Sequence, residues 1–575
     1  MSEAKRPTRT TPTRRVTATL RHTALRVLAQ ALNWQRLRDP NLDYILITLP
    51  TQLPALPEPR GWLRERVFGP APLSLVDLER MFRRVAADPR AQGVVLQLRG
   101  LAMPLADLQT LRDIITRLRD RGKQVICYAQ NYSLADYYVA AAADQILLQP
   151  GGDLMTLGLN QQAVFLKNAL DSIGVSLDVV AISPYKGALD QLALETISPE
   201  GREQLEWLLD SRYGMLLDGI AAGRGISREE AERLIDTAPH LDTEALEAGY
   251  VDALVYEEGL SAHLGAAHLQ VPQQAERKLI VKPPAVNTEK YVALLPIMGL
   301  MVAGESGSAP GEIPVPFVGA DRAGDLTVVQ QVRQLMQDKN AAAVIVYIES
   351  GGGDARAAAA MGAALEELAK DRPVVVYMNG VAASGGYWVA TPARWIIAQP
   401  GTITGSIGVV TAKGITQGLR DRLRLNVIEF RRGANAGIFS DMRPFTDSER
   451  AKIRAGVERV YARFIERVAA SRALSAEAVD AIGGGRVWTG AQALDNGLID
   501  ELGDLRTALN KAREFADLPE GTPLVLFRGK GKPLPPQLAA LNPAAMLRYA
   551  RRNLMLIANG RPQTILPVWI KQSID

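Results

Sequence analysis

The chain has 575 residues, 47% of them hydrophobic and 22% charged, so it can bury a large core without disulfides or metals. Because single hydrophobic cores stop growing at about 250 to 300 residues, two or more domains are expected. The one cysteine, Cys127, lies in an apolar run typical of a core position, which excludes a disulfide framework and a thiolate metal site. None of the four histidines has spaced ligands around it, so a metal enzyme is disfavoured.

Charge is distributed unevenly along the chain. Residues 1–40 carry nine Lys and Arg against two acids, and residues 528–575 carry eight against one, so the part between these ends is net acidic. An acidic body disfavours a nucleic-acid groove, and no nucleic-acid partner is expected. Basic ends suit an anionic membrane surface.

The N-terminal segment is amphipathic. It has neither a long apolar run that could span a membrane nor an apolar core followed by a cleavage site. Leu25, Leu28 and Leu32 follow helical spacing, while arginines interrupt the run. This pattern predicts a helix that lies in a bilayer interface, with docking to another subunit as the alternative. Peripheral membrane association is therefore expected, and the cytoplasmic side is favoured.

The chain repeats itself at an offset of 248 to 250 residues. Residues 124–151 align with 374–401, which pairs Tyr137 with Tyr387, and residues 245–252 align with 493–500. The sequence therefore predicts a tandem duplication of one domain.

Within each half, short β-branched runs alternate with helical patterns. Residues 93–98 and 343–348 are predicted strands, and residues 105–121 and 357–370 are predicted helices. This alternation indicates an α/β fold with mostly parallel sheets, and each half ends in helices, at 200–223 and 448–472.

Four segments follow from the composition. They are a basic amphipathic segment (1–40), an N-terminal repeat (41–285), a C-terminal repeat (286–530) and a basic tail (531–575). The linker between the repeats is rich in proline at 281–285, and residues 304–316 are expected to form a mobile loop.

Differences between the halves indicate where chemistry is placed, because a duplicated fold needs its core residues twice but a reaction centre needs each group once. Ser384 is aligned with Leu134, and the turn Gly351–Gly353 has no glycine counterpart in the first half. Lys186, conversely, is aligned with Ala434.

These three features fit one mechanism. A serine at a strand-to-helix turn exposes its hydroxyl, and backbone N–H groups there and in a glycine turn can stabilise an oxyanion. The C-terminal half has no histidine, so a lysine is the better candidate base. Lys186 would have to be neutral, which burial can impose.

The residues that carry this chemistry resemble those of the signal peptide peptidase A family, the long duplicated serine peptidases of the ClpP/crotonase-like fold. The resemblance rests on four features in the family's order: the glycine turn, Ser384-Gly385-Gly386-Tyr387-Trp388, Thr404-Gly405-Ser406-Ile407-Gly408 and the separate Tyr185-Lys186. It implies that Ser384 is the nucleophile, that Lys186 is the general base and that Ser406 holds the lysine amine. It also implies an oxyanion hole formed by the N–H groups of Gly352 and Gly385.

Two features depart from the family pattern. Ser350 stands where relatives often have a proline before the glycines, and the N-terminal segment is amphipathic where longer relatives commonly have a transmembrane helix.

The resemblance implies a serine endopeptidase whose Ser-Lys dyad is split between the halves. It further implies a homotetramer that encloses a chamber and degrades released signal peptides or other short apolar peptides, with no cofactor. No phosphate-binding loop motif is present, so ATP is not expected to drive the reaction. A crotonase-type acyl-CoA enzyme and a catalytically dead, membrane-associated peptide-binding scaffold are the alternatives.

Overall fold

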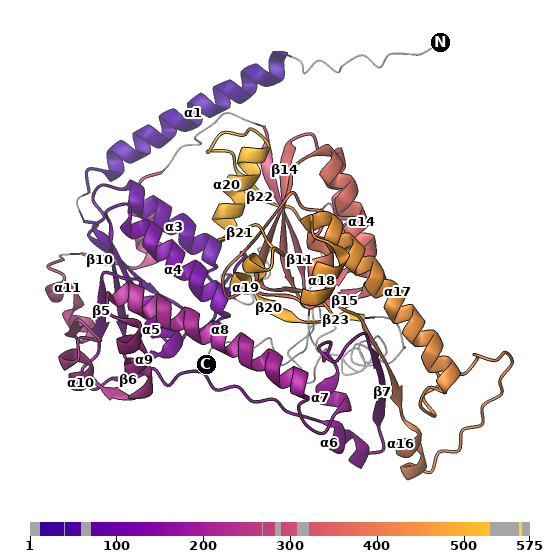
Figure 1. Ribbon diagram of the computed structural model, residues 1–575. Coiled ribbons are helices and arrows are strands. Elements are labelled where there is room, and N and C mark those ends of the chain that lie inside the picture. Colours follow the sequence, from indigo (N-terminus) through magenta and orange to yellow (C-terminus); the bar gives the residue numbers. More distant parts are fainter. Residues whose placement is uncertain are drawn as a thin grey trace.

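The computed structural model describes residues 12–39, 41–58, 69, 71–266, 268–281, 289–307, 321–529 and 563–565. The linker at 282–288, residues 308–316 of the predicted loop and the tail apart from 563–565 lie outside the described residues. The two repeats lie side by side, the N-terminal one at the left of Figure 1 and the C-terminal one at the centre and right.

The N-terminal repeat is built on a six-stranded parallel sheet with the strand order β10-β1-β2-β3-β5-β9. Its central strands are apolar runs that are almost fully buried, as a parallel sheet covered on both faces requires. In sheet order they are β10 (Leu269–Gln270), β1 (Tyr44–Thr48), β2 (Gly93–Leu98), β3 (Gln124–Ala129), β5 (Gln145–Leu148) and β9 (Ala253–Leu254). The main helices are α3 (Leu75–Ala87), α4 (Leu105–Arg119), α5 (Leu134–Ala140), α8 (Pro199–Arg224), α9 (Arg228–Asp236), α10 (Asp242–Glu247) and α12 (Pro272–Lys278).

The C-terminal repeat contains a parallel sheet in which the equivalent strands follow the same order, β22-β11-β14-β16-β17-β21. Its strands are β22 (Leu524–Leu526), β11 (Tyr291–Met298), β14 (Ala341–Ser350), β16 (Val374–Ala383), β17 (Trp395–Ala398) and β21 (Glu501–Leu502). Its helices include α13 (Asp325–Gln337), α14 (Ala355–Asp371), α15 (Gly385–Ala390), α17 (Asp447–Arg472), α18 (Ala476–Ile482), α19 (Gly490–Asp495) and α20 (Leu505–Phe515). The predicted duplication, its parallel sheets and its C-terminal helices are confirmed.

Smaller features are duplicated as well. A short ladder of β4 (Tyr132–Ser133), β6 (Asp153–Met155) and β8 (His240–Leu241) has its counterpart in the end of β16 with β18 (Ile403–Gly405) and β20 (Val487–Thr489). The aligned tyrosines donate equivalent hydrogen bonds, Tyr137 to the Tyr250 carbonyl and Tyr387 to the Leu498 carbonyl. Both hydroxyls are buried, so each repeat satisfies the same polar group in the same way.

A third sheet contains strands from both halves, in the order β13-β12-β15-β23-β19-β7. β7 of the N-terminal repeat pairs antiparallel with β19 of the C-terminal repeat along the full length of both strands. The members are β13 (Arg322–Gly324), β12 (Leu300–Val302), β15 (Gly352–Asp354), β23 (Gln563–Ile565), β19 (Val410–Ile415) and β7 (Ser176–Ala181). This pairing brings the segment that follows β7 onto the C-terminal repeat.

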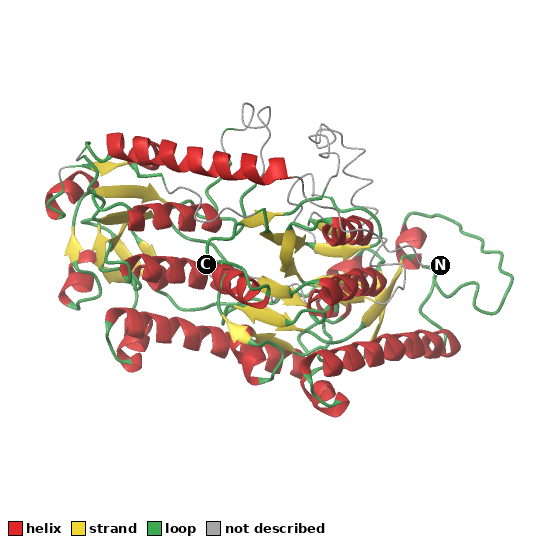
Figure 2. Cartoon of the chain, turned by 90° about the horizontal axis from the view of Figure 1, so that it is seen from above, coloured by secondary structure: helices red, strands yellow, loops and turns green. Residues whose placement is uncertain are grey.

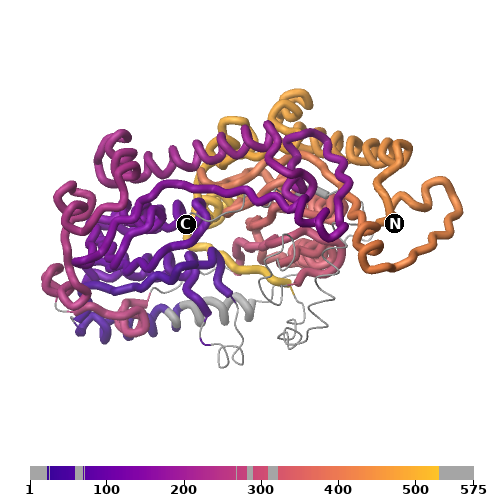
Figure 3. Tube along the Cα trace, turned by 90° about the horizontal axis from the view of Figure 1, so that it is seen from below, coloured from indigo at the N-terminus to yellow at the C-terminus, as the bar shows by residue number. Residues whose placement is uncertain are grey.

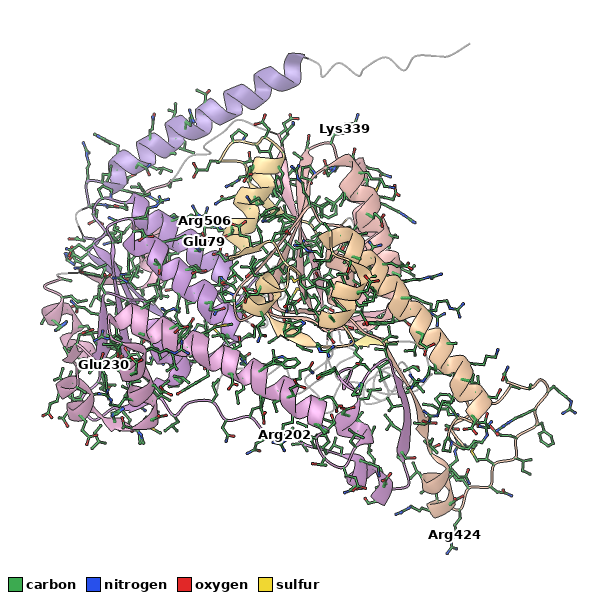
Figure 4. All side chains as sticks on the ribbon, viewed as in Figure 1. Glu79, Arg202, Glu230, Lys339, Arg424 and Arg506 are labelled. Atoms are coloured by element: carbon green, nitrogen blue, oxygen red, sulfur yellow. The ribbon has the colours of Figure 1, made fainter. Side chains whose placement is uncertain are left out.

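The repeats also contact one another through side chains. Arg506 donates to Glu79 at 2.9 Å across the interface, and Figure 4 shows these two side chains facing each other. The indole rings of Trp207, on α8, and Trp488 stack with centroids 5.0 Å apart. Figure 2 shows helices on both sides of the strands. The halves therefore form one body.

Helix α1 (Pro12–Arg36) stands apart from this body in Figure 1. Its C-terminal end is tied to the body, where Asn33 donates to the Val281 carbonyl at 2.9 Å. Leu28, Leu32 and Trp34 are exposed, whereas the side chain of Leu25 lies outside the described ones. Among the described helices, none combines the length and the apolar character that a membrane crossing requires.

Candidate active site

Ser384 lies at the junction of β16 and α15 in an unusual backbone conformation. Its φ and ψ are 57° and −116°, a region that costs an L-residue free energy and is found at functional turns. The Ser384 N–H donates to the Gly405 carbonyl at 2.8 Å, which holds the turn against β18. The backbone of Gly386 lies so close to that of Ser350 that a Cβ at Gly386 would be 2.4 Å from the Ser350 carbonyl oxygen. The turn therefore requires a residue without a side chain at position 386.

Lys186 reaches Ser384 from the other repeat. Its Nζ lies 2.7 Å from Ser384 Oγ and 2.8 Å from both the Oγ and the carbonyl oxygen of Ser406. The lysine is 1% exposed, and burial lowers its pKa well below the usual value. No ion pair to this amine occurs within the described residues. A neutral amine in this position can accept the hydroxyl proton of Ser384.

Ser406 belongs to the turn after β18. It has a positive φ of 51°, and its N–H donates to the Arg486 carbonyl at 2.6 Å. This backbone bond aims the hydroxyl at Lys186. The three predicted side chains, Ser384, Lys186 and Ser406, are thus brought together.

Two glycines position the lysine: Gly408, the last residue of the predicted motif that contains Ser406, and Gly485, which was not predicted from the sequence. Gly485 has a φ of +99°, and a Cβ there would lie 2.6 Å from the Cα of Lys186. A Cβ at Gly408 would lie 3.2 Å from Cδ of Lys186. Residues 483–485 are a run of three glycines in one half only, so the comparison of the halves could have found them.

The glycine turn lies beside Ser384 and Lys186. Gly352 has a φ of +96°, and its N–H donates to Ser350 Oγ at 3.2 Å, while that hydroxyl donates to the Gly299 carbonyl at 2.6 Å. The serine that departs from the family pattern therefore bonds to the predicted oxyanion donor. Gly385 is the first residue of α15, where an N–H has no acceptor within its own helix.

A strand formed by residues 563–565 fills the gap between β15 and β19. Gly352 is aligned with Ile565 and Gly353 with Thr564 in an antiparallel ladder, and Val410 is aligned with Gln563. An extended segment is thus already seated next to the glycine turn.

A buried carboxyl group lies close to the same turn. Asp107, at the start of α4, has no hydrogen-bond partner for Oδ1 among the described residues. Burial, together with the nearby charge of Glu349, raises its pKa to about 7. Glu349 accepts hydrogen bonds from the Asn379 side chain and the Gly380 N–H. Asp107 belongs to the N-terminal repeat, and Glu349 of the C-terminal repeat directly precedes Ser350. This pair of carboxyl groups therefore lies where the two repeats meet, next to the glycine turn.

A buried amine bonded to a serine hydroxyl, at a strand-to-helix turn beside a glycine turn, is the arrangement of a serine hydrolase that has no histidine. Two regions, residues 117–269 and 366–519, match the model of peptidase family S49, one region in each repeat. The chain belongs to peptidase family S49, so the predicted family resemblance is confirmed.

Curated relatives agree with this assignment. The chain is 31% identical to the chloroplastic serine protease SPPA of Arabidopsis thaliana, over 78% of this chain and 66% of that protein. It is 32% identical to Protease 4 of Salmonella typhi, over 77% of this chain and 72% of that protein. A solved structure of a ClpP1 mutant from Listeria monocytogenes covers 38% of this chain and 94% of its own, at 14% identity and a TM-score of 0.23.

Proposed function

We propose that the chain is a serine endopeptidase with a Ser-Lys dyad, in which Ser384 is the nucleophile and Lys186 the general base. The observation that carries this proposal is the 2.7 Å separation of Lys186 Nζ and Ser384 Oγ. A solvated lysine would be protonated at neutral pH and could not accept a proton, but burial favours the neutral amine.

The reaction then proceeds in two stages, formation of an acyl-enzyme and its hydrolysis. Ser384 Oγ attacks the carbonyl carbon of the peptide while its proton moves to Lys186 Nζ, and the oxyanion is held by the N–H groups of Gly352 and Gly385. Lys186 gives this proton to the leaving amine as the C–N bond breaks, which leaves an acyl-enzyme. Lys186 then accepts a proton from the water that attacks the ester and gives it to Ser384 Oγ as the acyl C–O bond breaks, which releases the carboxylic acid product and restores the free enzyme.

The Gly352 N–H must exchange its acceptor, from the Ser350 hydroxyl to the oxyanion, during this reaction. This N–H donates to Ser350 Oγ at 3.2 Å, a long bond that a developing oxyanion, as a charged acceptor, would outcompete. Ser406 keeps the lysine amine in place through both of its oxygens.

The proposed substrates are released signal peptides and other short apolar peptides, bound as an extended strand. The position of residues 563–565 supports this binding mode, because an antiparallel strand next to β15 lies beside the glycine turn. The chain contains no phosphate-binding loop motif, in keeping with hydrolysis that needs no ATP.

We further propose peripheral contact with an anionic membrane, on the cytoplasmic side, through α1. The exposed Leu28, Leu32 and Trp34 would enter the interface while the arginines of the basic N-terminal segment meet lipid phosphates. We also propose that the enzyme is a homotetramer.

The experiment compares the wild type with Ser384→Ala and Lys186→Met on a fluorogenic signal-peptide-like substrate. Lys413→Met is the matched control, because Lys413 is also fully buried and has its pKa lowered by burial, but it lies over the Phe445 ring. The proposal expects both dyad variants to lose turnover and the control to keep it. Full activity of Lys186→Met would overturn the base assignment.

The same assay separates the alternatives. A wild type that hydrolyses no peptide but binds coenzyme A in calorimetry would favour an acyl-CoA enzyme. Peptide binding by the wild type without turnover would favour a scaffold.

A further inference from the structure

A cavity of about 240 Å³ lies between α3 and α4 of the N-terminal repeat and α20 of the C-terminal repeat. Figure 3 shows the yellow segment that contains α20 beside the indigo part of the N-terminal repeat. Among the described residues, the charged side chains that line this cavity are those of Arg83, Arg117, Arg121, Arg506, Glu79 and Asp120. The other lining side chains are apolar. The cavity therefore has a net positive charge in apolar surroundings, where charges interact strongly.

The four arginines of the cavity differ in their partners. Arg506 donates to Glu79 at 2.9 Å, and a guanidinium nitrogen of Arg117 lies 2.7 Å from a carboxylate oxygen of Asp504. The Nε of Arg117 is buried and has no hydrogen-bond partner among the described residues. The guanidinium groups of Arg83 and Arg121 make neither a hydrogen bond nor an ion pair with any described residue. Guanidinium N–H groups around the cavity are therefore left without an acceptor.

Arg83 is partly desolvated although no carboxylate bonds to it. Burial lowers the pKa of its guanidinium, and the positive charges of Arg506 and Arg117 lower that pKa further, against the opposite effect of Glu79. The rest of its side chain is exposed, so the cavity is open to solvent. Because a desolvated cation in a protein is usually paired, an anion in the cavity would supply the missing partner.

The arginine cluster occurs in one repeat only. At the offset of 250 residues, two of its members are aligned with acids of the C-terminal repeat, Arg117 with Glu367 and Arg121 with Asp371, whereas Arg83 is aligned with Arg333. A charge pattern that the fold itself requires would be present in both repeats. A binding site, like the pair of Ser384 and Lys186, is needed once.

We propose that this cavity binds a phosphate group, held by Arg83 and Arg121 of the N-terminal repeat and by Arg506 of the C-terminal repeat. Three guanidinium groups suit a tetrahedral anion, because each can donate to a different phosphate oxygen, whereas a carboxylate offers two oxygens. Since one water occupies about 30 Å³, the cavity has room for such an anion and its water. Free phosphate and the headgroup of an anionic lipid present this same chemistry.

A phosphate in this cavity would join the two repeats, because Arg83 and Arg506 lie on opposite sides of their boundary. Lys186 and Ser384 also belong to different repeats. A ligand that binds only the docked repeats stabilises the docked state, which the proposed dyad requires. Binding is measured without peptide, so it does not depend on the proposed peptidase activity.

Calorimetric titration of the full-length protein with inorganic phosphate, at constant ionic strength in chloride, tests the site. Arg83→Gln should weaken binding by about tenfold or more, because it removes a charged donor. Arg80→Gln is the matched control, since Arg80 lies on the same helix but pairs with Asp77 outside the cavity. Phosphate should also raise the thermal unfolding temperature of the wild type and the control, but not that of Arg83→Gln. Equal weakening of binding in both variants, or acetate binding as tight as that of phosphate, would overturn the proposal.

Co-sedimentation with phosphatidylcholine vesicles that contain phosphatidic acid distinguishes the two sources of phosphate. For a lipid headgroup, Arg83→Gln should bind these vesicles about tenfold more weakly than Arg80→Gln, because α1 is intact in both variants. For free phosphate, the two variants should bind the vesicles equally and differ only in the titration. A wild type that binds no inorganic phosphate, together with equal vesicle binding by the two variants, would overturn the site. An active enzyme with that result contradicts this site alone, and an inert protein that binds phosphate contradicts only the proposed function.

Discussion

Lys186 and Ser384 are 198 residues apart in the chain, yet the Nζ of one lies 2.7 Å from the Oγ of the other. The contact exists because β7 leaves the N-terminal repeat and pairs with β19 of the other repeat, and Lys186 follows β7 by five residues. The site therefore depends on the docking of the two repeats. The residues that position Lys186 can therefore be tested by substitution, as Ser384 and Lys186 can.

Ser406→Ala should weaken catalysis without abolishing it. Its hydroxyl is one of two Ser406 oxygens that bond to the lysine amine, so the backbone carbonyl would remain. Loss of one hydrogen bond worth about 1 kcal/mol corresponds to roughly a five- to tenfold decrease in kcat. The pH profile should also shift, because the protonated amine would have one acceptor fewer in the variant. A variant with lower kcat but an unshifted profile would show that Ser406 does not act through the lysine.

Gly485→Ala should displace Lys186 and lower kcat strongly. The new Cβ would lie 2.6 Å from the Cα of Lys186 at a φ of +99°, so both the lysine segment and the backbone would have to move. Gly497→Ala is the matched control, because Gly497 also has a positive φ, 71°, but its Cβ would meet nothing within 4 Å. Steady-state kinetics of both variants, with thermal unfolding as a check on folding, should show the loss at Gly485 alone. Equal losses of kcat in the two variants would show that backbone strain, and not displacement of Lys186, is the cause.

Thr564→Pro should lower KM for peptide substrates. Residues 563–565 occupy the position next to β15 that we propose for the substrate, so they compete with it. Proline removes the backbone N–H of this strand and weakens the pairing. Thr564→Ala keeps that N–H and should behave like the wild type. If proline leaves KM unchanged, or raises it, the strand does not occupy the substrate position.

Asp107→Asn should flatten the pH dependence of stability. The pKa of Asp107 is raised to about 7 in the folded protein from a usual value of 3.8. Between these values the unfolded chain loses the proton and the folded chain keeps it, so the free energy of unfolding falls as pH rises from about 4 to 7. Denaturant unfolding at pH 5 and pH 7.5 should show a larger decrease for the wild type than for the variant. Parallel decreases in both proteins would contradict the raised pKa.

The repeat architecture could be predicted because it depends on local patterns. The β-branched runs at 93–98 and 343–348 and the helices that follow them are set by short-range periodicity, and the duplication made each element visible twice. Ser384 and Lys186 could be found because each occurs in one half only. The run at 483–485 also occurs in one half only, but the contact of Gly485 with Lys186 could not be predicted, since it joins distant segments. The β7–β19 ladder could not be predicted for the same reason. The hydrogen bond from the Gly352 N–H to the Ser350 hydroxyl depends on a turn geometry that the sequence pattern does not specify.

The pH dependence of kcat/KM tests the lysine base most directly, because it reports the pKa of the essential groups in the free enzyme. Burial lowers the pKa of Lys186, and only its neutral form can accept the serine proton, so activity should rise with pH through an apparent pKa well below the usual 10.5. Lys413→Met should leave this limb in place. A wild type whose activity rises only near pH 10, or whose limb persists in Lys186→Met, would contradict the Ser-Lys dyad.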